Sequence, residues 1–347
     1  MAETSLLRSG VIAGGNWIVD HVKMLDRWPP QDALANILSQ VSSNGGSPYN
    51  VLKNMARLGA TFPLEAVGLV GNDEAGRFIR DDCAKHRIGT TQMRTSQEIA
   101  TSYTDVMTDQ STGRRTFFHC RGANAQLGPE HFDFANVRAK IFHLGYLLLL
   151  DRLDEFVSAP DGTETTRAVE VLRAAHAAGL KVSADVVSEA SDRFGRIVRP
   201  ALPHIDYLFV NEFESAQVTG IATAPGGVID RRAVARAAAE LIRGGVREWV
   251  FIHFPDGVFA RSAAGQELWQ PSVQVPASFI QGAAGAGDAL AAGILFGLHE
   301  SWPVAEALLL GVSAAAASLA HPTCSEGVHS VAECRELAQR LGLRAGE

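Results

Sequence analysis

Short runs rich in β-branched and aromatic residues alternate along the chain with longer alanine-rich segments that carry apolar residues at helical spacing. Residues 182–187, 207–210 and 249–254 have the length and composition of buried strands. Residues 165–178 and 231–243 are predicted to be helices, and Ala-Gly or Gly-Gly follows at their ends, as is common at helix C-termini. The alternation predicts an α/β fold with a central, mostly parallel β-sheet flanked by helices.

Two parts of the chain interrupt this alternation. Residues 17–25 read as an isolated strand, and residues 102–108 and 115–120 read as strands on either side of the polar segment 109–113. Two strand-like runs joined by a short polar segment containing glycine are typical of a β-hairpin. We therefore predict strands here that stand outside the βα rhythm.

Such strands are expected to form a small sheet over the carboxyl ends of the main strands, where ligands of open α/β sheets bind. Parts of residues 16–45 and 100–121 are predicted to form this small β-sheet lid. Neither an internal repeat nor a Pro/Ser-rich linker divides the chain. Residues 1–347 are therefore interpreted as a single domain with the lid inserted into it.

The composition favours a small-molecule partner. The chain has 347 residues, 46% of them hydrophobic and 20% charged, which is enough to bury a large core. A formal net charge of −7 argues against nucleic acid and anionic membranes as partners, because both require a clustered basic surface. The longest strongly apolar run, at residues 141–150, is too short to span a bilayer.

The four cysteines suggest neither a disulfide framework nor a zinc site, since they show no CxxC spacing and no His-Cys pattern. They are Cys83, Cys120, Cys324 and Cys334. The first residues also lack the basic and apolar pattern of a signal segment. We expect reduced thiols in a cytoplasmic protein.

The run Gly285, Ala286, Gly287, Asp288 stands directly before the apolar stretch at residues 289–298. If a helix starts here, the main-chain amides of its glycine-rich first turn can approach a phosphate, and the helix dipole favours the negative charge. Asp288 would then take the proton of an acceptor hydroxyl, which suits phosphoryl transfer to an alcohol. The alternative is a glycine-rich turn capped by an aspartate.

Three further places carry polar chemistry. Asp20, at the end of a predicted strand, would offer two acceptor oxygens to neighbouring hydroxyls, unless it is simply exposed in a loop. Gly45 and Gly46 would let the backbone approach a ligand, and Asn50 both donates and accepts hydrogen bonds. The alternative for these three is a loop end and a helix cap.

Asn211 and Glu214 stand three residues apart after a predicted strand, so they share one face of a helical turn. The Glu214 carboxylate could hold Mg²⁺ through the water shell of the ion. An acid placed at a helix N-terminus because the dipole favours it there is an equally good interpretation.

Taken together and in this order, six pieces of the sequence resemble the ribokinase-like (PfkB) carbohydrate kinase family over nearly the whole chain. They are Gly14-Gly15-Asn16 with Asp20, residues 45–50 with Leu58-Gly59, residues 68–76, Gly122-Ala123-Asn124, residues 211–214, and residues 285–288. The resemblance implies a ribokinase-like fold and ATP-dependent phosphorylation of a hydroxyl on a sugar or sugar-like polyol, with ATP and Mg²⁺ as cofactors.

The resemblance also implies site residues. It makes Asp288 the general base. It also implies that Gly285, Ala286 and Gly287 stabilise the negative charge that develops on the transferring phosphoryl group. The substrate-binding positions that it implies are Asp20, Asn16, Gly45, Gly46, Asn50 and Asn124. The nucleotide-binding positions are Asn211, Glu214 and Gly257, with Glu214 also holding Mg²⁺ through water.

Two departures from the family pattern concern cofactor binding. The family usually carries Asp-Thr-Thr or a close variant before Gly-Ala-Gly-Asp, whereas this chain has Gly282-Ala283-Ala284, which makes activation by a monovalent cation doubtful. In place of the family's Thr-x-Gly-x-x-Gly, the chain has His253, Pro255 and Gly257. Proline has no amide hydrogen, so contacts to ATP in this loop should differ. His253 is interpreted as a residue that ends a strand.

The acceptor is less defined. Ser47 replaces the lysine that follows Gly-Gly in ribokinase, which removes one anchor for a charged group. Arg114, Arg115 and Arg121 surround the hairpin and could reach an anion, either on the acceptor or on the transferring phosphoryl group, or could simply be solvated. On balance we expect an unphosphorylated sugar or polyol.

Two rival functions stay open. One is a nucleoside (adenosine-type) kinase, in which Trp17, Tyr49 or Phe118 stacks on a base instead of packing in the core or lid. The other is a catalytically weak sugar-binding protein with a kinase fold, suggested by the changes at Gly282 and Pro255. Neither a dinucleotide GxGxxG fingerprint nor a Walker motif is found. If the lid exposes an apolar face, a homodimer is possible.

Overall fold

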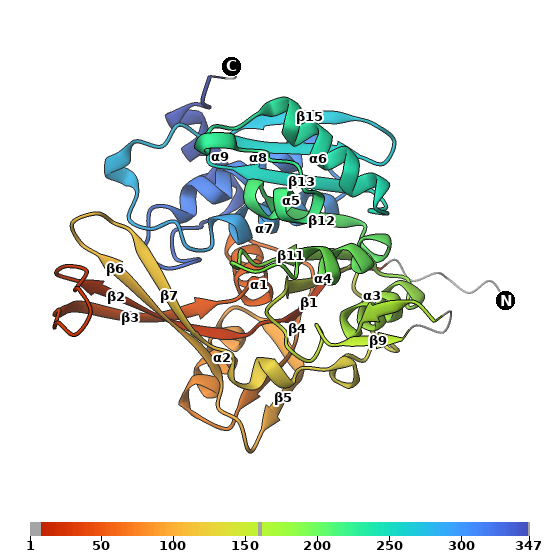
Figure 1. Ribbon diagram of the computed structural model, residues 1–347, viewed down its shortest axis with the longest axis horizontal. Coiled ribbons are helices and arrows are strands. Elements are labelled where there is room, and N and C mark those ends of the chain that lie inside the picture. Colours follow the sequence, from red (N-terminus) through yellow and green to blue (C-terminus); the bar gives the residue numbers. More distant parts are fainter. Residues whose placement is uncertain (1–7, 159–161, 346–347) are drawn as a thin grey trace.

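A computed structural model describes residues 8–158 and 162–345, and its two main parts are a large sheet covered by helices and a smaller sheet that projects from it (Figure 1). The large sheet has nine strands in the order β15 (Glu267–Pro271), β14 (Gly257–Ser262), β13 (Trp249–Phe254), β12 (Tyr207–Asn211), β11 (Lys181–Val186), β8 (Ile141–Leu147), β1 (Val11–Gly15), β4 (Leu64–Gly71) and β5 (Ile88–Ser96). The seven strands from β13 to β5 are parallel, and β14 and β15 are antiparallel.

Helices cover both faces of the large sheet. They are α1 (Ser47–Leu58), α2 (Glu74–Lys85), α3 (Arg167–Ala177), α4 (Phe194–Ala201), α5 (Glu212–Thr219), α6 (Arg231–Arg243), α7 (Ala286–His299), α8 (Val304–Ser318) and α9 (Val331–Leu341). Alternate strand residues point to opposite faces. Leu208 and Val250 pack with α3 to α6, whereas Phe209 and Phe251 pack with α1, α7 and α8. The predicted α/β class is confirmed.

The small sheet has the strand order β3 (Ile37–Gly45), β2 (Ile18–Leu25), β6 (Ser102–Asp109) and β7 (Arg115–Cys120). It extends to the left of the main body in Figure 1. Strands β6 and β7 form the predicted hairpin, and β2 lies where the isolated strand is expected. Strand β2 pairs with β6 in parallel, so the small sheet is mixed.

The expected and observed elements differ mainly where strands are short or polar. The segment expected to begin a helix at residue 165 instead completes β10 (Glu164–Thr166), which pairs with β9 (Phe156–Ser158), and α3 starts at Arg167. The residues of β3 give no strand signal of their own because most of them are polar and exposed. Within residues 8–158 and 162–345, no helix is both long enough and apolar enough to cross a membrane.

Candidate active site

Parallel strands bring the residues at their carboxyl ends to one edge of a sheet, and the polar side chains of this protein gather at that edge. The strands β1, β8, β11 and β12 end there, at Gly15, Leu147, Val186 and Asn211. Helices α1 and α7 begin beside them, and the contacts between α1 and α7 are extensive. Residues from distant parts of the sequence therefore meet around the first turn of α7.

The first turn of α7 has the backbone needed for anion binding. Its N-cap, Gly285, has a φ of 73°, and a Cβ at this position would lie 2.6 Å from the Cβ of Cys324. Both the dihedral angle and the crowding require glycine. No residue in the described part of the chain accepts a hydrogen bond from the amides of Gly287 and Asp288. These amides are open donors at the positive end of the helix dipole.

Asp288 is buried at this turn and accepts hydrogen bonds from two side chains. Asn50 Nδ2 donates to Asp288 Oδ2 over 2.7 Å, and the Tyr146 hydroxyl lies 2.9 and 3.0 Å from the two carboxylate oxygens. Burial raises the pKa of Asp288, and the bonds from Asn50 and Tyr146 counteract part of that rise. A carboxylate whose pKa is raised is a stronger base than an exposed one.

The orientation of the Asn50 amide is set by its neighbours. Asn44 Nδ2 donates to Asn50 Oδ1 over 2.6 Å and also to Ser325 Oγ over 2.7 Å. Because the oxygen of Asn50 already accepts this bond, its nitrogen is directed towards Asp288. The end of β3, the first helix and the loop before α9 thus cooperate to position one hydrogen bond to the carboxylate.

Asp20 lies on the small sheet and faces the same region. The Cys324 thiol donates to Asp20 Oδ2 over 3.6 Å, and a Cβ on Gly45 would lie 2.3 Å from Asp20 Oδ1. Burial raises the pKa of Asp20 to about 7, and the charge of Asp288 adds to the rise. Asp20, Gly45 and Asp288, which the sequence assigns to one site, are therefore brought together.

A buried hydrogen-bond chain underlies the site. The Ser47 hydroxyl donates to Asp185 Oδ2 over 3.2 Å and lies 2.8 Å from His143 Nε2, while His143 Nδ1 lies 2.9 Å from Ser183 Oγ. Burial lowers the pKa of His143 to about 3, so this ring is neutral, and burial raises the pKa of Asp185. Ser47, which stands where ribokinase carries a lysine, is part of the buried support of the site.

Asn16, Gly46 and Asn124 also lie near the site, but the contacts that they make are with backbone atoms of the protein. Asn16 donates to Leu149 O over 3.1 Å and accepts from the amide of Tyr146. Gly46 packs against Asn16, since a Cβ on it would lie 2.1 Å from Asn16 O. Asn124 donates to Trp17 O over 3.0 Å. The contacts of Asn16 and Asn124 hold the loop after β8 and the start of β2 in place, and their binding to a substrate stays a prediction.

Asn211 and Glu214 cap helix α5 reciprocally. Glu214 N donates to Asn211 Oδ1 over 2.7 Å, and Asn211 N donates to Glu214 Oε2 over 2.8 Å. Ser188 Oγ and Asn211 Nδ2 both donate to Glu214 Oε1. The carboxylate thus has one of its roughly four acceptor positions left. Burial raises the pKa of Glu214 to about 7, and the charge of Asp288 contributes to the rise.

No group of three or more His, Cys, Asp or Glu side chains arranged to hold a metal ion occurs within residues 8–158 and 162–345. The carboxylates of Asp185 and Glu214 nevertheless lie close enough to repel each other. A divalent cation next to them would reduce this repulsion. The site thus fits an ion bound largely by water and by ligand oxygens, with Glu214 and Asp185 nearby.

The turn between β13 and β14 contains Pro255, where the sequence predicts altered contacts to ATP. Ser272 Oγ donates to Pro255 O over 3.0 Å, and Arg344 Nη1 donates to Asp256 Oδ1 over 2.6 Å. Gly257 lines a cavity of about 660 Å³ together with Trp269 and other residues. His253 is the second-last residue of β13, and its ring carbon Cε1 lies 3.1 Å from where a Cβ on Gly287 would be, so it borders the first turn of α7.

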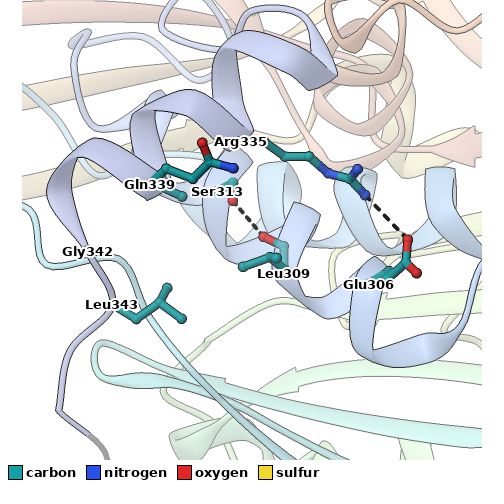
Figure 2. Close-up of a pocket in the computed structure, with 8 residues that line it drawn as sticks. Glu306, Leu309, Ser313, Arg335, Gln339, Gly342 and Leu343 are labelled. Atoms are coloured by element: carbon teal, nitrogen blue, oxygen red, sulfur yellow. Dashed lines mark hydrogen bonds and ion pairs between the residues drawn. The ribbon is translucent and has the colours of Figure 1, made fainter.

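A second cavity, of about 490 Å³, lies between α8 and α9 and is shown in Figure 2. Arg335 and Glu306 form an ion pair of 3.8 Å at one end of it, and Ser313 lines its wall. None of the residues that the sequence assigns to the site lines this cavity. It is therefore separate from the candidate active site.

The aromatic residues considered for stacking on a base have other contacts. Trp17 is fully buried and donates to Val67 O over 2.8 Å, and Tyr49, also fully buried, donates to Asp82 Oδ2 over 2.7 Å. Phe118 is exposed and stacks on Trp28 with ring centroids 6.4 Å apart. Trp17 and Tyr49 are core residues, as their alternative interpretation states.

Sequence reasoning missed Tyr146, His143 and Asp185. Tyr146 and His143 lie in the apolar run at residues 141–150, and Asp185 lies inside the predicted strand at residues 182–187. The available signal was their position near the carboxyl end of a strand, where polar residues interrupt an apolar run.

Comparisons with known proteins agree with this geometry. The pattern of the pfkB family carbohydrate kinase matches residues 15–330. The ATP-dependent ribose-1-phosphate kinase of Halopiger xanaduensis is 28% identical over 287 residues, covering 82% of this chain and 83% of that protein. The 5-dehydro-2-deoxygluconokinase of Shouchella clausii is 22% identical over 303 residues, covering 85% of this chain and 86% of that protein.

A solved structure shows the fold. The ribokinase of Arabidopsis thaliana complexed with ribose and ATP superposes with a TM-score of 0.76 at 21% sequence identity, covering 96% of this chain and 99% of that chain. The predicted ribokinase-like fold is confirmed.

Proposed function

The chain belongs to the pfkB family of carbohydrate kinases, and we propose that it transfers the γ-phosphoryl group of ATP to a hydroxyl of a sugar or sugar-like polyol. The observation that carries this proposal is the first turn of α7, where the buried carboxylate of Asp288 stands beside the open amides of Gly287 and Asp288 itself. A base and an anion site in contact are what phosphoryl transfer to an alcohol requires.

In the proposed reaction, Asp288 accepts the proton of the acceptor hydroxyl. The hydroxyl oxygen forms a bond to the γ-phosphorus, the bond from that phosphorus to the bridging β-γ oxygen breaks, and ADP leaves. The amides of the first turn of α7, with Gly285 and Ala286 shaping the turn, stabilise the charge on the transferring phosphoryl oxygens.

Asn50 and Tyr146 position the base rather than react. Both donate to the carboxylate of Asp288, so they favour its ionised form and fix the direction of its free lone pairs. Asp20 accepts hydrogen bonds from other hydroxyls of the acceptor, and Gly45 leaves room for them because any side chain there would strike the Asp20 carboxylate.

The nucleotide is assigned to the region of Asn211, Glu214 and Gly257, where the charge of Asp288 in the first turn of α7 acts on Glu214. The cavity of about 660 Å³ next to Gly257 supports a nucleotide contact there. Mg²⁺, when bound, neutralises charge on the phosphate oxygens, and Glu214 would hold the ion through water with Asp185 nearby. The Asn211 side chain keeps Glu214 in position through the α5 cap.

The small sheet is proposed to act as a lid and as a dimer interface. Of the 13 large apolar side chains exposed in the described part of the chain, eight belong to this sheet or its connecting loop. These eight are Trp28, Leu34, Ile37, Leu38, Val41, Tyr103, Phe117 and Phe118. Phe117 and Phe118 are adjacent on β7 and point to opposite faces, so these side chains lie on both faces of the small sheet. Exposed apolar side chains mark an interaction surface, and a second copy of the chain would cover those of one face symmetrically.

The test of the proposed function is ADP release from Mg·ATP by the purified protein against ketoses, aldoses, sugar acids and nucleosides. The proposal expects release that depends on an acceptor and a product heavier than that acceptor by one phosphoryl group. Binding of an acceptor with no ADP release across the whole panel would instead identify a binding protein that has lost catalysis.

A further inference from the structure

Strand β7 presents one face to the candidate acceptor site. Residues two apart on a strand point to the same face, so Arg115, Phe117 and His119 share it. The sheet register pairs His119 with Thr104 and Thr104 with Asp20, which places His119 and Asp20 in one row on one face. Arg115 and Asp20 therefore lie on the same face of the small sheet.

Two polar atoms on this face are buried without a partner. Arg115 Nη1 and His119 Nε2 are inaccessible to solvent and make no hydrogen bond to any described residue. His119 Nδ1 is satisfied, since it lies 3.0 Å from Thr104 Oγ1. Leaving a buried polar group unpaired is costly, and for a charged group such as guanidinium the cost is greater. A ligand that supplies the missing partners would remove this cost.

Arg115 is directed towards the acceptor side of the site. It lies close enough to Cys324 to interact with it electrostatically. Cys324 in turn contacts Asp20 through its thiol and packs against the position of Gly285. The guanidinium is therefore near the group proposed to hold substrate hydroxyls, on the lid side of the first turn of α7.

Two other basic side chains near the site, Arg121 and Lys53, have acidic partners, whereas Arg115 has none among the described residues. Arg121 Nη1 lies 2.6 Å from Asp151 Oδ1, and Lys53 lies 3.0 Å from Asp82 and 2.9 Å from Glu326. No described carboxylate forms an ion pair with Arg115. The protein thus provides a half-buried positive charge beside the acceptor site and leaves its counter-ion to come from elsewhere.

We propose that the acceptor is an anionic sugar, whose carboxylate or phosphate binds Arg115 while the hydroxyl to be phosphorylated lies at Asp288. This inference rests on the proposed kinase function and replaces our expectation of an uncharged acceptor, which was based on the loss of a lysine at Ser47. Guanidinium binds carboxylate and phosphate through paired hydrogen bonds, so either anion fits.

His119 contacts a different part of the same acceptor. His119 stands four positions after Arg115 on the strand, a span of about 13 Å along the backbone. The Arg115 side chain covers part of that span, while His119 stands in the row of Asp20. His119 Nε2 therefore meets an oxygen between the anionic group and the hydroxyls that Asp20 holds.

The experiment compares matched acceptors in wild-type protein and in Arg115→Gln. The pairs are gluconate against glucose, which tests a carboxylate, and ribose 5-phosphate against ribose, which tests a phosphate. Phosphorylation is followed by ADP release, and acceptor binding is measured separately by calorimetry in the presence of a non-hydrolysable ATP analogue. Arg114→Gln is the control, because Arg114 is the exposed neighbour of Arg115.

The proposal expects at least one anionic acceptor to be preferred over its neutral partner. Arg115→Gln should raise the KM and Kd of that acceptor about 10- to 100-fold, as expected for a hydrogen-bonded charge pair, with little change for the neutral partner. Arg115→Lys should restore part of the affinity, and Arg114→Gln should behave as wild type.

Two results would overturn the inference while leaving the kinase function intact. One is a preference for both neutral sugars. The other is an equal loss of kcat for neutral and anionic acceptors in Arg115→Gln, which would assign Arg115 to the transferring phosphoryl group. If no acceptor is phosphorylated, the proposed function fails, and calorimetry still decides whether Arg115 binds the anionic sugars.

Discussion

The two sides of helix α7, to which we assign the acceptor and the nucleotide, are built differently. On the acceptor side, Asp288 is held by Asn50 of α1 and Tyr146 of β8, partners 238 and 142 residues away in the sequence. On the nucleotide side, the main assembly is the α5 cap, in which Asn211 and Glu214 are three residues apart. The acceptor side therefore depends on the whole fold, whereas the nucleotide side depends largely on one local turn.

This difference predicts what a substitution on each side of α7 should change. A change on the acceptor side removes a contact that only the assembled fold provides, at a buried group whose pKa is already raised. A change on the nucleotide side alters a local cap that leaves the rest of the site standing. The predictions below test this division in order of decreasing effect.

Apart from removal of the base itself, the largest effect is expected for Asp20→Asn. Loss of a charged acceptor for substrate hydroxyls should lower kcat/KM for the sugar by about 10- to 100-fold. The KM for Mg·ATP should not change, because Asp20 lies on the lid side of α7. Steady-state kinetics with each substrate varied in turn checks this. The control is Asp105→Asn, since Asp105 pairs with Lys23 on the same sheet.

The same variant should not be less stable at alkaline pH. Burial raises the pKa of Asp20 to about 7 from an ordinary value of 3.8, so the folded state binds the proton more tightly than the unfolded state. The stability that this proton contributes is complete below about pH 4 and is lost as the pH rises through 7. At pH 8 the Tm of Asp20→Asn should equal or exceed that of wild type, and a clearly lower Tm would contradict the account.

A smaller effect, on the KM of Mg·ATP instead of the kinetics with the sugar, is expected for Glu214→Gln. Because the carboxylate is assigned to the hydrated Mg²⁺, its loss should raise the KM for Mg·ATP about 10-fold and leave the KM of the sugar unchanged. Glu212→Gln, at the neighbouring position in the first turn of α5, is the matched control. A rise in the KM of the sugar alone would break the division between the two sides.

Tyr146→Phe should change the pH dependence more than the maximal rate. The Tyr146 hydroxyl bond lowers the pKa of Asp288, so its removal raises that pKa. The base must be ionised to accept a proton, and the acid limb of the kcat profile should therefore move to higher pH, by about one unit for one hydrogen bond. A pH–rate profile with an unmoved acid limb would show that Tyr146 does not act through Asp288.

The smallest effect on kcat is expected when potassium is removed. A Cβ on Gly282 would lie 2.7 Å from Pro322 Cα and 2.8 Å from His321 O, so the loop before α9 occupies the space that an acidic side chain would need. Replacing potassium by tetramethylammonium at constant ionic strength should leave kcat unchanged. Strong activation by potassium would mean that other groups supply the cation site.

The sequence predicts well the features that depend on neighbouring residues, and poorly those that depend on contacts between distant parts of the chain. The bounds of β13 and α6 agree with expectation to the residue, because composition and helical spacing alone define them. Strand β3 gave no signal, since its polar residues form a strand only through pairing with β2. The start of α3 was placed too early because residues 164–166 pair with β9, a contact that no periodicity contains.

The same contrast applies to the site. Asp288, Asn50 and Asp20 were found because they stand in motifs that resemble a known family, and the structure brings all three together. Tyr146 and Asp185 stand in no such motif. Their proximity to Asp288 follows from strand order in the sheet, which places β8 beside β11 although 33 residues separate the end of one from the start of the other.

The most direct test of the central claim is the turnover of Asp288→Asn, a variant that keeps the size of the side chain. The account predicts that kcat falls by about 10²- to 10⁴-fold, the usual contribution of a general base, while the Kd values for acceptor and nucleotide and the Tm stay near those of wild type. Turnover close to that of wild type in a folded variant would contradict it, because the first turn of α7 would then transfer the phosphoryl group without Asp288.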